Sequence, residues 1–208
     1  MRKVFLVILL TGLMVFGSFA QMNDMMFGVK GGLTLGKLSI ENDSDINDNW
    51  DRKFRMGFAV GGMMVMPLNE NMHLQGELLY VMKGEKFEVK DTLGDDFDIS
   101  ADVIEVPILL KYMAMENMAV YGGVSLDYIM SAKDKGDSYE NDLIEDEIVK
   151  RFGFGLSFGA QYIMDQIIFD ARYDIGLSNI FEEDNMYYGF MGKTKLNTIY
   201  VTVGYLFE

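Results

Sequence analysis

Charged residues at alternate positions of apolar or glycine-rich segments are the groups in this sequence best placed to act together. The set carries both signs of charge: Lys30, Glu77, Glu105, Lys111, Asp127, Asp170, Arg172 and Asp174. Alternate residues of an extended chain point to the same side, so these groups can share one face. Enclosed charges must be paired or hydrated, because an isolated buried charge is strongly destabilising. We therefore expect an ion-pair network, with a path for protons or small ions as the alternative.

His73 is the only histidine, and the sequence contains no cysteine. Without cysteine, thiolate metal sites and cysteine catalysis are excluded. A histidine can act as the base for a serine nucleophile, which is the chemistry that a lipid-modifying enzyme would need. His73 instead follows a polar turn at 67–71, and we interpret it as a polar residue at the end of a segment. We assign no catalytic residue and predict no enzyme activity.

Acidic residues outnumber basic ones by 32 to 18, and oxygen ligands are those that Ca²⁺ and Mg²⁺ prefer. Asp43, Asp45 and Glu145 are weak candidates for binding these ions. The stretch that starts at Asp43 fails as a calcium loop, because Asp48 and Phe54 stand where the motif needs glycine and glutamate. We assign no metal site and no cofactor, and we expect the acidic stretches to form a solvated, repelling surface.

The N-terminal residues are typical of a secretory signal peptide. Two basic residues precede an apolar run over 4–16, and a cleavage site ends at Ala20. We predict a signal peptide over 1–20 and one mature domain over 21–208. An uncleaved anchor is the alternative, although the run is short for a membrane span. Loss of the two basic residues changes the net charge from −14 to −16, which argues against binding to nucleic acid.

The elements that position the charges are segments in which apolar residues alternate with polar residues or glycine. They are Met26–Ile40, Phe54–Met66, Met72–Glu88, Phe97–Met113, Met118–Ala132, Lys150–Ile163, Ile167–Ser178 and Thr194–Phe207. A period of two predicts β-strands with one apolar face, as in the last segment, where Val201, Val203 and Tyr205 share a side. Each segment is long enough to cross a bilayer as a tilted strand, which takes about ten residues.

Short and long connections alternate between these segments. Turns at 67–71, 114–117 and 164–166 separate polar stretches that are much longer. This order is typical of outer-membrane barrels, with turns in the periplasm and loops outside the cell. The stretch 133–150 is long enough for a short helix or hairpin above the membrane. Pro107 lies inside the fourth segment, where it lacks a ladder donor, and predicts a bulge there.

The polar face distinguishes two kinds of barrel. A water-soluble barrel of the lipocalin type turns its apolar face inward around a ligand and needs a well-solvated exterior. Here the polar face is rich in glycine, as in the alternation of Gly153, Gly155 and Gly159 with large apolar residues, which suits a narrow interior. The sequence therefore favours an all-β fold, an eight-stranded antiparallel up-and-down transmembrane β-barrel, over the lipocalin-like alternative.

Four stretches, in the same order along nearly all of the mature chain, carry a resemblance to a known family. They are Phe27–Leu35, Leu74–Lys86, Ile104–Tyr112 and Phe169–Asn179. Together they resemble the PorT-like outer-membrane β-barrel proteins of Bacteroidota. The resemblance implies an eight-stranded barrel in the outer membrane and no family catalytic residues. Some members of that family are linked to protein secretion through the outer membrane.

These observations lead us to expect a non-enzymatic, integral outer-membrane protein of a Gram-negative envelope. Its role would be envelope-structural or surface-interacting, through acidic extracellular loops, with both termini in the periplasm. An accessory of secretion or envelope assembly is the alternative, and an envelope lipid-modifying enzyme is a third hypothesis. The expected partners are outer-membrane lipid and lipopolysaccharide, the barrel-assembly machinery during biogenesis and, for the accessory role, a secretion or envelope protein.

Overall fold

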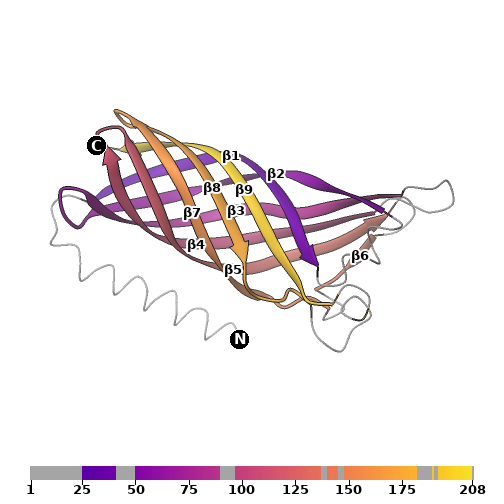
Figure 1. The fold of residues 1–208 in the computed structure, drawn as a ribbon. Coiled ribbons are helices and arrows are strands. Elements are labelled where there is room, and N and C mark those ends of the chain that lie inside the picture. Colours follow the sequence, from indigo (N-terminus) through magenta and orange to yellow (C-terminus); the bar gives the residue numbers. More distant parts are fainter. Residues whose placement is uncertain are drawn as a thin grey trace.

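The fold comes from a computed structural model, which describes residues 25–40, 50–89, 97–136, 140–144, 148–181, 189 and 192–207 (Figure 1). The predicted signal peptide over 1–20 and the weak ion-binding candidates Asp43, Asp45 and Glu145 lie outside these residues. The strands of the described chain are β1 (Met26–Ile40), β2 (Trp50–Pro67), β3 (Met72–Val89), β4 (Phe97–Met115), β5 (Met118–Gly136), β6 (Glu140–Asp142), β7 (Phe152–Met164), β8 (Ile167–Gly176) and β9 (Thr194–Phe207).

All strands except the three-residue β6 join into one closed antiparallel barrel. The sheet runs in the order β4-β3-β2-β1-β9-β8-β7-β5, and an additional pairing between β4 and β5 closes it. Each of these eight strands therefore pairs with a neighbour on both sides. The ring in Figure 1 therefore confirms the predicted eight-stranded barrel.

The two ends of the barrel differ in the length of their connections. At the end that we name the turn end, residues 68–71, 116–117 and 165–166 join consecutive strands, and Phe27 pairs with Phe207. The strand ends that the longer connections join lie at the opposite end, which we name the loop end (Figure 1). Part of one of these connections forms a hairpin, one of the two alternatives expected for 133–150, because β6 pairs antiparallel with residues 133–135 of β5.

Strand alternation sorts the side chains into an outer band and an inner lumen. Large apolar residues such as Leu33, Phe154 and Val201 are more than half exposed on the outer face, at 56%, 55% and 62%. Charged and polar residues such as Glu77 and Arg172 are buried on the inner face. The core of the molecule is therefore the lumen. No helix in the described part of the chain is long and apolar enough to cross a membrane.

The predicted bulge at Pro107 is wrong. Pro107 pairs with Ser125 of β5, and β4 keeps the same register with β3 on both sides of the proline. Val106 and Pro107 are the two residues of this stretch that have no paired residue in β3. The missing N–H therefore removes a local hydrogen bond without inserting a residue.

The bulges lie elsewhere in the sheet. The β2–β3 register shifts between Phe54 and Ala59, and the β4–β5 register shifts between Asp102 and Val103. Gly84 lies opposite the first shift with φ 148°, and a Cβ there would stand 2.1 Å from the carbonyl oxygen of Ile99. Only glycine fits that backbone and that space.

Buried apolar side chains fill the lumen at the loop end. Strand residues contribute most of this cluster, which we name the apolar plug: Leu38, Ile40, Phe87, Ile99, Ala101, Val103, Ile129, Ala132 and Leu196. The connections contribute Leu143, Val149 and Phe181, which are 0%, 8% and 0% exposed. The loop end is therefore packed with side chains and does not open into the lumen through this cluster.

Candidate functional site

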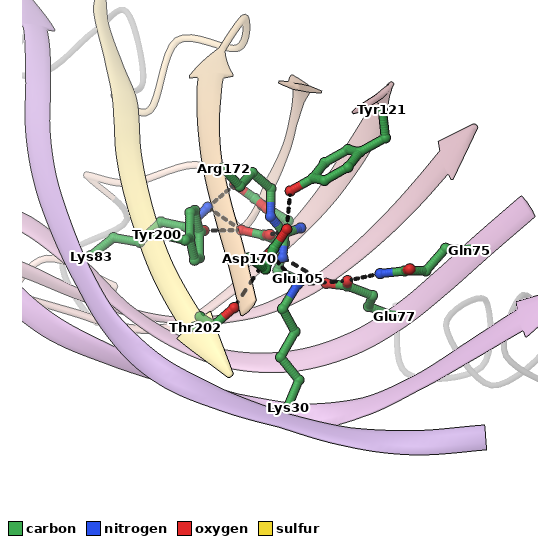
Figure 2. Close-up of polar contacts among 11 residues, drawn as sticks. Lys30, Gln75, Glu77, Lys83, Glu105, Tyr121, Asp170, Arg172, Tyr200 and Thr202 are labelled. Carbon is green, nitrogen blue, oxygen red and sulfur yellow. Dashed lines mark hydrogen bonds and ion pairs between the residues drawn. The ribbon is translucent and has the colours of Figure 1, made fainter. Parts of the chain in front are cut away.

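The middle of the lumen holds a network of charged and polar side chains, shown in Figure 2. Alternation aims each of them inward from its strand, and six of the barrel strands contribute. The main members are Lys30 of β1, Glu77 and Lys83 of β3, Glu105 of β4, Tyr121 of β5, Asp170 and Arg172 of β8, and Tyr200 of β9. All of these residues are buried.

Lys30 stands between two carboxylates on the side of the network nearer the turn end. Its Nζ lies 2.9 Å from Glu77 Oε1 and 2.6 Å from Asp170 Oδ2. Asp170 also accepts hydrogen bonds from the Tyr121 hydroxyl at 2.7 Å and from the Thr202 hydroxyl at 3.3 Å. Each charge in this group therefore has a partner of the opposite sign, as burial requires.

Glu105 is the centre of a second group. Lys83 Nζ lies 2.5 Å from Glu105 Oε2 and 3.0 Å from Asp127 Oδ2. The Tyr200 hydroxyl donates to Glu105 Oε2 at 2.6 Å. Hydrogen bonds to an ionised carboxylate are about twice as strong as those between neutral groups, so Tyr200 adds to the stability of the Lys83–Glu105 pair.

Arg172 joins the two groups. Its Nη2 lies 2.6 Å from Glu77 Oε2 and its Nη1 3.7 Å from Glu105 Oε1. The guanidinium also lies over the ring of Tyr200, 4.8 Å from its centroid, which is a cation–π arrangement. The side chains of Arg172, Glu77 and Glu105 are all 0% exposed. Figure 2 shows Arg172 between the two carboxylates.

Small residues make room for the large members of the network. A Cβ at Gly159 would stand 2.5 Å from the Tyr121 hydroxyl, so the glycine lets this ring cross the lumen. In the β8–β9 ladder Arg172 pairs with Tyr200 and Asp170 with Thr202. The register therefore sets each charged group of β8 beside its polar partner of β9.

The structure brings together six of the eight residues predicted for the lumen, and places the other two beside them. The six are Lys30, Glu77, Glu105, Asp127, Asp170 and Arg172. Lys111 and Asp174 are buried at 2% and 3% exposure. Within the described residues, neither carboxylate oxygen of Asp174 has a hydrogen-bond partner, and no ion pair within 4.0 Å involves Lys111.

Lys83, Tyr121 and Tyr200 are the network members that the sequence interpretation missed. Each stands at an inward position by the parity of its strand, as Lys83 does with Glu77 and Glu85. Leu79 and Val81 lie between these charged residues on the same face, so the inward positions of β3 are not polar throughout. Counting every second residue along the strand would have found all three.

Two features bear on nucleophilic chemistry. Gly155, Ser157 and Gly159 have the spacing of a nucleophile motif that escaped the sequence interpretation, but they lie within β7 and not at the strand-to-helix turn that such a motif needs. His73 is the second residue of β3, pairs with Lys111 in the ladder, and its Nδ1 has no hydrogen-bond partner among the described residues. No ladder or hydrogen bond of the described chain joins Ser157 to His73.

The carboxylates at the centre of the network already have cationic partners. In the part of the chain that the structure describes, no group of three histidine, aspartate or glutamate side chains could hold a metal ion. Lys30, Lys83 and Arg172 occupy the carboxylates that would otherwise be ligands. The arrangement therefore supports rigidity and closure of the lumen better than it supports ligand exchange.

Structures of known proteins resemble this fold at low sequence identity. Neisserial surface protein A is 14% identical with a TM-score of 0.54, and the match covers 87% of this chain and 97% of that one. Ail, the attachment invasion locus protein of Yersinia pestis, is 14% identical over 88% and 99% of the two chains, with a TM-score of 0.49. OprG of Pseudomonas aeruginosa is 13% identical over 88% and 96%, with a TM-score of 0.42.

The likeness to Neisserial surface protein A is a likeness of fold. No curated protein is significantly similar to this chain in sequence. A family model, however, matches residues 19–182, which is most of the chain, and its description is outer membrane protein beta-barrel domain. With its closed barrel and outward apolar band, the chain belongs to the outer membrane protein β-barrel domain family.

Proposed function

We propose that this protein is a non-enzymatic structural barrel of the outer membrane whose lumen is closed and whose interactions are made by its loop end. The single observation that carries the proposal is the filling of the lumen. Arg172, Glu77 and Glu105 occupy its middle with side chains that are 0% exposed, and the apolar plug occupies its loop end. An eight-stranded barrel is just wide enough for side chains to fill it.

Conductance across a planar bilayer tests the closed lumen. Purified protein is expected to produce no current steps above the baseline. The double variant Glu77→Ala with Arg172→Ala removes two large side chains, and their ion pair, from the middle of the lumen. The double variant Phe87→Ala with Phe181→Ala removes two aromatic rings from the apolar plug. Steps in either variant but not in the native protein support closure. Regular steps in the native protein contradict it and favour the ion-path alternative.

The surface role rests on the acidic stretches of the sequence and on the orientation typical of the family. We place the turn end and both termini in the periplasm, and the loop end outside the cell, because short turns are periplasmic in such barrels. Lipid and lipopolysaccharide would surround the outer band. A deletion strain is expected to become more permeable to detergents. Complementation by a chain in which the four long connections of the barrel are shortened is expected to restore only this barrier; these connections are 41–49, 90–96, 137–151 and 177–193. Full recovery by that shortened chain contradicts a role for the loops.

The accessory role in secretion or envelope assembly is the second candidate. It is favoured by the PorT-like stretches Leu74–Lys86 and Ile104–Tyr112, which form the neighbouring strands β3 and β4. Comparison of secreted proteins from the deletion and parent strains separates the two roles. Loss of secreted proteins favours the accessory role, and an unchanged set argues against it. Lipid A mass spectra from the same strains test the enzyme hypothesis, for which no difference is expected.

Assembly into the membrane is proposed to use the barrel-assembly machinery, as for other barrels of this architecture. Tyr205 and Phe207 end β9 on the outer face, at 44% and 49% exposure, with their rings packed edge to face 5.8 Å apart. Replacing both aromatics with alanine is expected to lower the amount of folded protein in the outer membrane. A matched replacement of Phe152 and Phe154, exposed on β7, is expected to have a smaller effect.

A further inference from the structure

The barrel wall is incomplete between β1 and β2 at the loop end. Their ladder runs from Met26↔Val65 to Gly36↔Arg55 and stops there, although β1 continues to Ile40 and β2 begins at Trp50. On its other side β1 stays paired with β9 as far as Ile40↔Thr194. Residues 37–40 therefore lack a strand partner on the β2 side, and we name this region the seam.

Two side chains take the place of the missing ladder at the seam. The Leu38 amide donates to Glu85 Oε2 at 3.1 Å, and the Leu38 carbonyl accepts from Arg52 Nη2. Arg52 and Glu85 are paired to each other through Nη2–Oε2 at 2.7 Å and Nε–Oε1 at 3.1 Å. Their side chains are only 6% and 0% exposed. The bidentate Arg52–Glu85 ion pair thus closes the seam on the inner side of the wall. The outer side of the wall is recessed there.

A cavity of about 420 Å³ lies at the seam. Its apolar lining includes Leu35, Tyr173 and Ile199, and its polar lining includes Lys37, Ser39 and Asn197. This volume is within the range of sites that hold small ligands. The cavity is separate from the charge network in the middle of the lumen, because none of the paired network residues lines it.

The lining changes from apolar to polar toward the loop end. In the β1–β9 ladder Leu35 pairs with Ile199, then Lys37 with Asn197, then Ser39 with Lys195. Nearer the middle of the strand, Leu33 pairs with Val201, and both are exposed in the outer band, at 56% and 62%. An elongated ligand with a hydrocarbon tail would lie along the apolar pairs, with its polar head at the loop end.

Lys37 supplies a charge that this head could meet. Arg52 is already paired with Glu85. Within the described residues Lys37 makes no ion pair, and its Nζ lies 5.6 Å from the centroid of the Phe54 ring, which also lines the cavity. Charge complementarity therefore favours an anionic head.

We propose that the seam cavity binds an anionic amphiphile, a hydrocarbon chain that carries a phosphate, such as a phosphorylated lipid of the surrounding membrane. The tail packs on Leu35, Ile199 and Tyr173, and the phosphate accepts hydrogen bonds from Lys37. Ser39 lies beside the head. The Arg52–Glu85 pair forms the floor and keeps the bound molecule out of the lumen.

Native mass spectrometry of the full-length folded protein in a neutral detergent, octaethylene glycol monododecyl ether, tests this site. Dodecyl phosphate is expected to bind as one tightly held adduct. Inorganic phosphate at the same concentration is expected neither to bind nor to displace it, because the free ion lacks the tail. Displacement by inorganic phosphate would overturn the proposal in favour of a simple phosphate site.

Two variants and a matched control locate the adduct. Lys37→Gln is expected to weaken dodecyl phosphate binding about tenfold, the effect of losing one charge-assisted hydrogen bond. Ser39→Trp fills the cavity from an exposed position and is expected to abolish the adduct. Lys86→Gln removes the same charge from an exposed position of β3 that does not line the cavity, and is expected to bind normally. Equal loss in Lys37→Gln and Lys86→Gln, or no loss in either, would overturn the site.

Discussion

Asp170 and Asp174 lie on the same inward face of β8 but have different surroundings. Asp170 is 2.6 Å from Lys30 and accepts hydrogen bonds from two hydroxyl groups. Asp174 is equally buried, at 3% exposure, and neither of its oxygens has a hydrogen-bond partner in the described part of the chain. Ser157 and Thr198 flank it in the ladders, and their hydroxyl groups are also without partners. Among the described residues, the same residue type therefore has an ion pair and hydrogen bonds at one position and neither at the other.

Asparagine substitutions at these two positions are expected to differ in the size of their effects. Asp170→Asn leaves Lys30 without this carboxylate and should lower the free energy of unfolding by about 3 kcal/mol, as for other broken buried pairs. Asp174→Asn replaces a buried carboxyl group whose oxygens accept no hydrogen bond in the described part of the chain and should change the free energy of unfolding by much less. Urea unfolding in lipid vesicles, followed by fluorescence of the single tryptophan, measures both. Similar losses at the two positions would contradict this difference.

Tyrosine hydroxyl groups in the lumen should also matter more than those on the outer face. Tyr121 donates to Asp170 at 2.7 Å, and Tyr121→Phe is expected to lower the unfolding free energy by about 1.5–3 kcal/mol, the range for a hydrogen bond to a charged group. Tyr162 is 45% exposed on the outer face of β7. Tyr162→Phe is expected to change the unfolding free energy by less than about 0.5 kcal/mol. The same unfolding experiment compares them, and equal effects would contradict the role of the hydroxyl.

At the scale of the elements, the seam depends on side chains where other parts of β1 depend on a neighbouring strand. Glu85→Ala removes the acceptor of the Leu38 amide, so exchange of that amide with deuterium should become about tenfold faster or more, the equivalent of one hydrogen bond. Hydrogen exchange read by mass spectrometry or NMR measures it. Glu88→Ala removes the exposed pair with Lys53 and serves as the control, with no change expected at Leu38.

The turn between β7 and β8 has a specific backbone requirement. Asp165 has φ 55°, a left-handed conformation that aspartate, asparagine and glycine tolerate and β-branched residues resist. Asp165→Val is therefore expected to lower the unfolding free energy by about 1–2 kcal/mol. Asp165→Asn and Asp165→Gly are expected to leave it nearly unchanged, and a loss in all three variants would point instead to the carboxylate.

The elements themselves follow closely from the sequence. Alternation located Met26–Ile40 and Thr194–Phe207 as β1 and β9 with the same bounds, because lipid-facing residues at every second position leave a clear period of two. It placed the start of β2 four residues late, at Phe54 instead of Trp50, because Arg52 and Lys53 do not continue the apolar pattern. Nothing in the local sequence indicated that β1 and β2 separate at the seam.

At the scale of the whole molecule, the outward apolar band sets the environment that the barrel needs. Val201 is 62% exposed near the middle of β9, and Val201→Lys is expected to lower the unfolding free energy in vesicles by about 2–4 kcal/mol, as for a charge at the bilayer midplane. Ser39→Lys lies nearer the loop end of the wall and is expected to lower it by about 1 kcal/mol or less. Equal effects would contradict the expected depth of the two positions.

The candidate site was less predictable than the fold, because its contacts depend on how the strands are staggered around the ring. Parity along each strand predicted that Arg172 and Glu77 point inward. It could not predict that they meet, since they are 95 residues apart in sequence. Their contact depends on the register of every ladder between β3 and β8, and a shift of one residue in any of them would turn a face outward.

The pairing of β1 with β9 has a consequence for how the molecule is made. Phe27 pairs with Phe207 and Lys30 with Gly204. The ring can therefore close only when β9 is available to pair with β1. Contacts between such distant residues fold slowly, because the chain between them must be ordered first. Until then the apolar faces of all the strands are available for aggregation. Closure of the ring is therefore expected to be a late step in folding, because it needs the pairing of β1 with β9.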